Sequence, residues 1–530
     1  MRRCVRVALA LAVAAVVADC GSVASYDVGG TVSGLVGSGL VVGSGSDSVA
    51  IAAGATSFTL PKPFASGSAY SVTVVTQPAG QTCTVTNGTG VVDAANVTTV
   101  LVSCRAGVSN QWVWQSGSDT AGAAGVYGSQ GTAAPENFPG ARWGVGFWVD
   151  ATGSLWVFGG VGGNLAGSGY LNDLWQYSPG TNEWAWVGGS QALNVAGSYG
   201  TQGTAAAGNT PGARAYAATW SDAAGNLWLF GGWGYDASGT LGELNDLWKF
   251  SRALGQWQWV SGSNTVWVSG QTPPSSAPGG RESASSWSDV SGDFWLFGGL
   301  GANGRTNDLW KYDPPSGAWA LVSGSQTAVN TSGVYGTEGM SSATNLPGAR
   351  QNAVAGTDGS GNVWMFGGYG YDSTGTAGAL NDLWTFNTSS SRWVWVSGAE
   401  TVNAAGVYTA AVPVPGARTQ AAGGLDHLGN LWVFGGQGYD SADNVGALND
   451  LWVYSVNTGS WSWVSGAQTS GYVAGVYGSE GVPAAGNTPG PRGYARMQID
   501  SAGKPWMFGG DGSDATNTVG TLGDLWEFLP

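Results

Sequence analysis

The apolar residues of this 530-residue chain occur in short stretches separated by glycine-rich and polar turns. The stretch 155–158, Leu-Trp-Val-Phe, is apolar at every position and ends on two glycines, and similar stretches recur to the end of the chain. Short segments rich in β-branched and aromatic residues and bounded by Gly, Asp and Asn predict strands. A strand without a polar face is buried on both sides, which indicates sheets packed against one another. The pattern predicts an all-β protein.

Four short signatures recur in a fixed order from Asn110 onward. The first is Pro-Gly-x-Arg, which ends at Arg142, Arg214, Arg281, Arg350, Arg418 and Arg492. The second is an apolar run that closes on Gly-Gly, after Phe158, Phe230, Phe297, Phe366, Phe434 and Phe508. The third is Asn-Asp-Leu-Trp, with Trp at 175, 248, 310, 384, 452 and, after Gly523-Asp524, at 526. The fourth is Trp-x-Trp, as in Trp112-Val113-Trp114, with Trp319 and Leu321 as its weakest copy.

The repeats have a period near 70 residues. Successive tryptophans of the Gly-Gly signature lie 72, 67, 69, 68 and 74 residues apart. Between the first and second signatures each copy contains Asp-x-x-Gly, as in Asp150 to Gly153, where Asp opens a tight turn and Gly takes the left-handed position. Each copy is therefore expected to form a four-stranded antiparallel meander, and an internal period of this length decides the fold.

This repeat resembles the kelch family of β-propellers, through its Gly-Gly doublet, its downstream Trp and its four-strand unit. The resemblance implies a six-bladed propeller over residues 110–530, although the linkers between blades are longer than usual. The chain enters at the fourth signature and leaves at the third, so both ends are incomplete blades. We expect the strand at Trp112 to Trp114 to pair with the last strand, because this closure removes open sheet edges.

A smaller module precedes the repeats at residues 25–105. It contains no Trp, is rich in Val, Thr, Ser and Gly, and alternates in 70–74 and 97–102, which predicts short strands. Cys83 and Cys104 are expected to form a disulfide that closes the segment between them into a loop. The module resembles immunoglobulin-like β-sandwiches in type, and we interpret it as a spacer, with an independent ligand-binding role as the alternative.

The first 20 residues have the features of an export signal. Three arginines, at positions 2, 3 and 6, precede an uncharged apolar run of 12 residues, 7–18, which is too short to span a bilayer. Val17 to Cys20 resembles a lipobox and would lead to lipidation of Cys20, whereas cleavage after Ala24 would release a secreted protein. Both alternatives predict export, to the outer membrane or cell surface or to the medium, and a membrane contact only through a lipid anchor.

Composition excludes several classes of function. The net charge is −15, and the 18 basic residues are not clustered beyond position 6, so we expect no nucleic-acid partner. The chain has one His and four Cys, which cannot supply a site of several imidazole or thiolate ligands. Copper chemistry of the galactose oxidase kind, which the kelch fold can host, is therefore not expected, and His427 is interpreted as a turn residue. We predict no cofactor.

Most of the repeated residues are interpreted as structural. Most of the 29 Trp lie in the signatures and are expected to fill the core between blades, with sugar stacking as the alternative. Each signature Arg is expected to bind an Asp or a backbone group, because a buried guanidinium needs partners. The candidate acceptors are the aspartates of the third signature: Asp173, Asp246, Asp308, Asp382, Asp450 and Asp524.

The long loops share one face of the predicted ring and are the candidate binding surface. Tyr235, Tyr371 and Tyr439 lie in the loops after the second strand, each followed by an Asp, and the sixth copy carries Asp514. Calcium is one interpretation of these aspartates and ordinary turn hydrogen bonding is the other. Five linkers carry a Tyr, at 127, 199, 335, 408 and 477, and the linker before Arg281 carries Trp267 instead.

Two functions follow from these features. The first is an exported, non-enzymatic interaction scaffold that binds a protein or a glycan across its loop face. Near-identical loops around a ring repeat the same groups, which favours binding over catalysis. The alternative is a carbohydrate-active enzyme without copper that uses carboxylates such as Glu136, Glu243 or Asp511. A structural part of a larger assembly is a third possibility.

Overall fold

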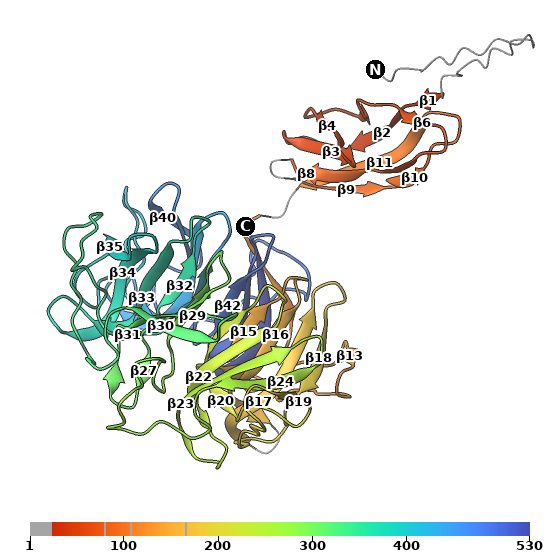
Figure 1. The fold of residues 1–530 in the computed structure, drawn as a ribbon. Coiled ribbons are helices and arrows are strands. Elements are labelled where there is room, and N and C mark those ends of the chain that lie inside the picture. Colours follow the sequence, from red (N-terminus) through yellow and green to blue (C-terminus); the bar gives the residue numbers. More distant parts are fainter. Residues whose placement is uncertain (1–23, 79–80, 107–108, 165–166) are drawn as a thin grey trace, which may run out of the picture. The chain divides into compact units, whose positions relative to one another are not determined.

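The computed structural model describes residues 24–78, 81–106, 109–164 and 167–530, and all of the regular elements in these ranges are β-strands (Figure 1). The chain divides into two compact units, Met1–Ser109 and Asn110–Pro530. The export signal and Cys20 lie outside the described residues. None of the described segments forms an apolar helix long enough to cross a membrane.

Unit 1 is built from short strands around a small apolar core. One sheet has the order β5-β2-β11-β9 and another the order β4-β3-β8, with Val28, Leu40, Val42 and Val100 fully buried in the core. The strands are β1 (Ser25–Tyr26), β2 (Val28–Ser33), β3 (Leu40–Ser44), β4 (Asp47–Ile51), β5 (Ser57–Thr59), β6 (Phe64–Ala65), β7 (Ala69–Ser71), β8 (Thr73–Thr76), β9 (Gln81–Thr86), β10 (Thr89–Val91) and β11 (Val97–Ala106).

A disulfide joins two neighbouring strands of unit 1. Cys83 on β9 lies directly opposite Cys104 on β11, with their Cα atoms 4.0 Å apart, and the two sulfurs are bonded. Both half-cystines are buried in the unit 1 core. The pairing predicted from the sequence is present, and a disulfide of this kind is compatible with an extracellular protein.

Unit 2 is propeller-like: antiparallel meanders of four strands follow one another along the chain. The innermost strands are β15 (Gly146–Val149), β21 (Ala218–Ser221), β25 (Ser285–Ser288), β32 (Val354–Thr357), β37 (Ala422–Leu425) and β42 (Arg496–Ile499). The second strands are β16 (Leu155–Asn164), β22 (Leu227–Tyr235), β26 (Phe294–Phe297), β33 (Val363–Tyr371), β38 (Asn430–Tyr439) and β43 (Pro505–Ser513).

The third strands are β17 (Gly167–Ser178), β23 (Leu241–Ser251), β29 (Leu309–Asp313), β34 (Ala377–Asn387), β39 (Val445–Ser455) and β44 (Val519–Leu529). The outermost strands are β12 (Gln111–Ser116), β18 (Glu183–Gly188), β24 (Gln256–Ser261), β30 (Ala318–Ser323), β35 (Arg392–Ser397) and β40 (Ser460–Ser465). Two-residue strands complete the sheets: β13 (Ala133–Ala134), β14 (Arg142–Trp143), β19 (Ala205–Ala206), β20 (Arg214–Ala215), β27 (Leu300–Gly301), β28 (Gly304–Arg305), β31 (Arg350–Gln351), β36 (Arg418–Thr419) and β41 (Arg492–Gly493).

The inner strands lie side by side in a continuous series. β15 contacts β21, β21 contacts β25, β25 contacts β32, β32 contacts β37 and β37 contacts β42, and β42 in turn contacts β15. The first and last strands of unit 2 also meet, because β12 pairs antiparallel with β44 and places Trp114 opposite Trp526. Residues at opposite ends of the chain's last 420 positions are therefore neighbours around one axis.

The Gly-Gly doublet marks a bulge where each second strand contacts the next sheet. In five of the six copies the register with the third strand shifts at this point, as between Phe158 and Gly160, whereas the ladder of β26 ends before the doublet. Gly159 has a φ of 61°, and a Cβ there would lie 2.7 Å from the carbonyl oxygen of Arg214 in the following sheet. Only glycine combines this left-handed conformation with so close an approach.

The apolar core lies between consecutive sheets. In one cluster Trp156 and Phe158 of β16 pack against Trp248 and Phe250 of β23 and Trp257 of β24. The cluster where the first and last strands of unit 2 meet is also rich in aromatic residues, with Trp112 of β12 in contact with Phe434 and Phe528. Because the second strands are buried on both faces, each supplies side chains to two interfaces.

Candidate functional site

The six signature arginines are bound to the six candidate aspartates. Arg142 donates through Nη1 to Asp173 Oδ1 at 2.6 Å and through Nη2 to Oδ2 at 2.9 Å, and it also donates to the carbonyl oxygens of Gly140 and Gly159. Both side chains are buried. The same fork joins Arg214 to Asp246, Arg281 to Asp308, Arg350 to Asp382, Arg418 to Asp450 and Arg492 to Asp524. These groups hold the sheets and are not free to bind a ligand.

The linker tyrosines complete this arrangement. Tyr335 donates its hydroxyl to Asp382 Oδ2 at 2.7 Å, and Trp384 donates its indole N–H to the same oxygen. Burial and the nearby Asp382 hold the pKa of Tyr335 well above its usual range, so the phenol stays a donor. Equivalent bonds are made by Tyr127, Tyr199, Tyr408 and Tyr477. The repeated tyrosines are therefore part of the framework.

The structure places the residues predicted for the loop face on different strands and linkers. Trp267 is only 8% exposed and packs over Gly280. Tyr235, Tyr371 and Tyr439 are half-buried at equivalent ends of β22, β33 and β38, and no ring contact joins any two of them in the described ranges.

The aspartates after these tyrosines bind backbone and hydroxyl groups. Asp236 accepts from the backbone N–H groups of Ser238, Thr240 and Val266, and it is 1% exposed. Asp372, Asp440 and Asp514 make the same turn. No group of three or more His, Cys, Asp or Glu side chains is placed to hold a metal ion among the described residues. His427 is exposed in a turn.

A ring of left-handed residues surrounds the axis at one end of the inner strands. These residues, two positions after each signature Arg, have φ between 55° and 66°: Gly144, Tyr216, Ser283, Asn352, Gln420 and Tyr494. Their backbones are linked from sheet to sheet, since Tyr216 N–H donates to the Gly144 carbonyl at 2.7 Å and Gly144 N–H donates to the Tyr494 carbonyl at 3.3 Å. Because these hydrogen bonds hold the backbone of neighbouring sheets together, they also fix where the side chains of these residues begin.

Tyr216 and Tyr494 of this set lie close to Trp143, the residue before Gly144. The centroid of the Trp143 ring lies 5.4 Å from that of Tyr216 and 5.1 Å from that of Tyr494, and the two tyrosine rings are 5.3 Å apart. Gln420 donates its amide N–H to the Tyr494 hydroxyl at 2.8 Å. All three aromatic side chains are half-buried. We call Trp143, Tyr216 and Tyr494 the axial aromatic cluster.

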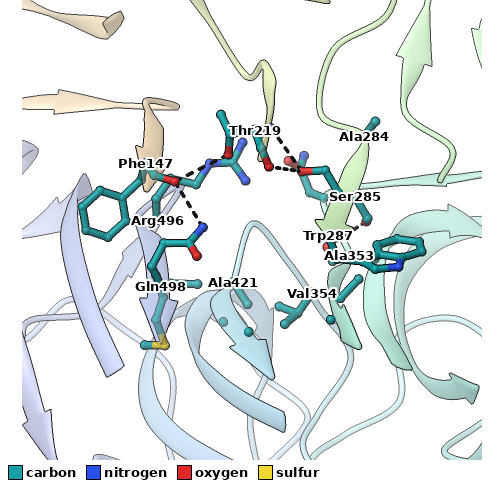
Figure 2. Close-up of a pocket in the computed structure, with 18 of the residues that line it drawn as sticks. Phe147, Thr219, Ala284, Ser285, Trp287, Ala353, Val354, Ala421, Arg496 and Gln498 are labelled. Carbon is teal, nitrogen blue, oxygen red and sulfur yellow. Dashed lines mark hydrogen bonds between the residues drawn. The ribbon is translucent and has the colours of Figure 1, made fainter. Parts of the chain in front are cut away.

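A cavity of about 330 Å³ extends from this ring along the inner strands. Its polar lining consists of the Arg496 guanidinium and of hydroxyl and amide side chains, among them Thr219, Asn352, Gln420 and Gln498, with small apolar residues between them. Figure 2 shows Arg496, Gln498 and Thr219 close to the carbonyl group of Phe147, to which Gln498 donates at 3.1 Å. The cavity and the axial aromatic cluster share Tyr216 and Tyr494, so they form one continuous candidate site.

Three carboxyl groups near the ring have raised pKa values. Burial, together with the neighbouring carboxyl of Glu243, raises the pKa of Glu282 to about 7. Burial also raises the pKa values of Glu243 and Asp511. Glu282 and Asp511 both interact electrostatically with Tyr494. Of the carboxylates considered from the sequence, Glu243 and Asp511 are thus half-buried near this end of the axis, whereas Glu136 is exposed in a linker.

Sequence reasoning missed the axial cluster because its members are not repeated. Trp143, Tyr216 and Tyr494 occupy positions next to the Pro-Gly-x-Arg signature where the other copies carry small, amide or, at Glu282, carboxyl side chains. The sequence signal that could have found the cluster is this departure from the repeat.

No protein-family model matches the chain, and comparison with curated proteins finds no match.

Proposed function

We propose that unit 2 is a six-bladed propeller of kelch type, closed by the pairing of β12 with β44. The continuous contacts of the inner strands support this proposal, as does the position of Gly509 in the last copy, where an added Cβ would lie 2.5 Å from the carbonyl oxygen of Arg142 in the first. Unit 1 would act as the spacer of an exported protein, and its disulfide suits an oxidising compartment.

We further propose that this propeller binds a carbohydrate, without turnover, at the mouth of its axial cavity. The observation that carries the proposal is the axial aromatic cluster, whose half-buried rings stand beside amide and hydroxyl groups. Aromatic faces cover the apolar face of a sugar ring, and fixed polar groups bind its hydroxyls. A cavity of about 330 Å³ admits a small ligand, whereas a protein partner would need roughly 800 Å² of surface on each side.

Binding of the full exported chain to a glycan array, followed by calorimetric titration of the best ligand, tests this function. Trp143→Ala is expected to weaken binding at least about tenfold, because it removes the largest of the three rings of the cluster. Trp463→Ala is the matched control, since Trp463 is 36% exposed on the outermost strand β40 and lies away from the axis. Absence of any sugar binding, or equal losses in the two variants, would contradict the proposal.

A second function is favoured by the coupled carboxyls. Glu282, with a pKa of about 7, and its neighbour Glu243 form a pair of titratable groups beside the cluster, and such pairs serve as acid and base in glycosidases. Incubation of the bound oligosaccharide with the protein, followed by chromatography, separates the alternatives. Cleavage products that the wild type forms and Glu282→Gln does not form would establish enzymatic activity. An oligosaccharide that the wild type leaves unchanged favours a binding protein.

A further inference from the structure

Arg496 introduces a charge into the axial cavity that the repeat does not require. It is the first residue of the inner strand β42, and the equivalent positions in the other inner strands carry Gly146, Ala218, Ser285, Val354 and Ala422. It is also the only charged residue among those that line the cavity. The charge is therefore a local feature of one sheet.

The guanidinium of Arg496 has no hydrogen-bond or ion-pair partner within the described ranges of the chain. In Figure 2 Arg496 is drawn beside Phe147 and Thr219, and the dashed line between these two residues joins the Thr219 hydroxyl to the Phe147 carbonyl and does not end on Arg496. This differs from the six signature arginines, each of which is bound by a carboxylate and two carbonyl groups. Five N–H donors of Arg496 thus remain available at the cavity.

An uncompensated guanidinium in a confined cavity is energetically unfavourable. Burial lowers the pKa of Arg496, and the only group that raises it is the Tyr216 phenol, so no carboxylate of the protein offsets the charge. Arginine's planar fork matches a carboxylate, to which it can donate two parallel hydrogen bonds. The neighbouring Thr219 hydroxyl and Gln498 amide offer further polar contacts.

We propose that the ligand of this site is an acidic sugar whose carboxylate binds Arg496 inside the axial cavity while its ring lies against the axial aromatic cluster. This proposal rests on the carbohydrate-binding function above. Tyr216 belongs to the cluster and lines the same cavity as Arg496, so one ligand can reach both groups. The cavity volume lies at the small end of the range for small-molecule sites, which suits one or a few sugar residues.

The test uses the full exported chain and an array of galacturonic, glucuronic and mannuronic acid oligomers. Each oligomer is present as the free acid and as its methyl ester, beside neutral gluco-, galacto- and manno-oligosaccharides. The wild type is expected to bind at least one free acid about 10- to 100-fold more tightly than its ester, the range for a hydrogen bond to a charged group. In Arg496→Gln this ratio is expected to fall close to one, and Arg496→Lys should give an intermediate ratio because it keeps the charge without the fork.

Arg252→Gln is the matched control, because it removes a guanidinium that is already paired with Asp150. Its ratio of acid to ester affinity should equal that of the wild type. If acids and esters bind equally, or if Arg496→Gln keeps the preference, the acidic-sugar proposal is overturned while carbohydrate binding stands. If no sugar binds the wild type, both proposals fail.

Discussion

At the scale of the residue, the third-signature aspartate accepts four hydrogen bonds in five of the six repeats, and Asp308, whose linker lacks the tyrosine, accepts three. Asp382 binds two guanidinium nitrogens of Arg350, the hydroxyl of Tyr335 and the indole of Trp384. A buried ion pair stabilises a fold only when its remaining polar groups are satisfied, and here the tyrosine and tryptophan satisfy them. The sequence indicated the Arg and Asp partners, but the tyrosine, 47 residues from its aspartate, could be assigned only from the structure.

Glu282 is expected to make stability depend on pH. Its pKa is raised from 4.5 to about 7 in the folded chain, so between these values the folded state keeps a proton that the unfolded state has lost. The stabilisation from this proton is complete below about pH 4.5 and is lost as the pH rises through about 7. Glu282→Gln should therefore be more stable than the wild type at pH 8, by roughly 2 kcal/mol for a partly exposed group, and the difference should vanish near pH 4.

Melting temperatures from pH 4 to 9 measure this difference. Glu338→Gln is the control, because Glu338 is exposed in a linker and should give the same curve as the wild type. A wild type and a Glu282→Gln variant with parallel curves over the whole range would contradict the assignment of a buried carboxyl at this position.

At the scale of the element, the sequence predicts strands well because burial on both faces leaves a strong pattern. The second strands, such as β16 with Leu155 to Phe158, are apolar throughout and are buried at all four of these positions. The pattern of residues 70–74 is less informative. Its alternation suggested one strand, whereas the structure has two strands, β7 and β8, separated at Val72. Here pairing with two different partners, β10 and β3, interrupts the strand.

The strand β12 is expected to be essential for unit 2. Trp112 is 1% exposed and contacts Phe434, Trp526 and Phe528, so Trp112→Ala leaves a large cavity where the two ends of the unit meet. The expected cost is about 3 to 5 kcal/mol, with association of the exposed edge of β44. Calorimetry should show a lower melting temperature, and light scattering should show larger particles.

Trp463→Ala tests whether the destabilisation expected for Trp112→Ala is specific to β12 or follows the loss of any tryptophan on an outermost strand. Trp463 lies on β40, is 36% exposed and contacts only Tyr408 among the described rings. Its removal should change the melting temperature little. Equal destabilisation by the two substitutions would show that β12 has no special role in joining the ends of unit 2.

At the scale of the whole molecule, each unit has its own core, and we expect the two units to unfold separately. The Cys83–Cys104 bond spans 21 residues of unit 1 alone. Replacing both cysteines with Ala should lower the stability of unit 1 by about 3 kcal/mol. Calorimetry should show this as a shift of one transition, with the transition of unit 2 unchanged. A single transition that shifts as a whole would contradict independent unfolding.

The sequence by itself determined the repeated features of this protein: its strands, their period and the residues of the Arg and Asp pairs. These features recur in every copy, so each copy reports the same local requirement. Only the tertiary structure decided the candidate site. The site contains Trp143, Tyr216, Tyr494 and Arg496, which are spread over about 350 residues. Each of them differs from the residues that most other copies carry at the same position. They meet because the inner strands of consecutive sheets contact one another around one axis. A local sequence pattern cannot show which of the non-repeated residues become neighbours there.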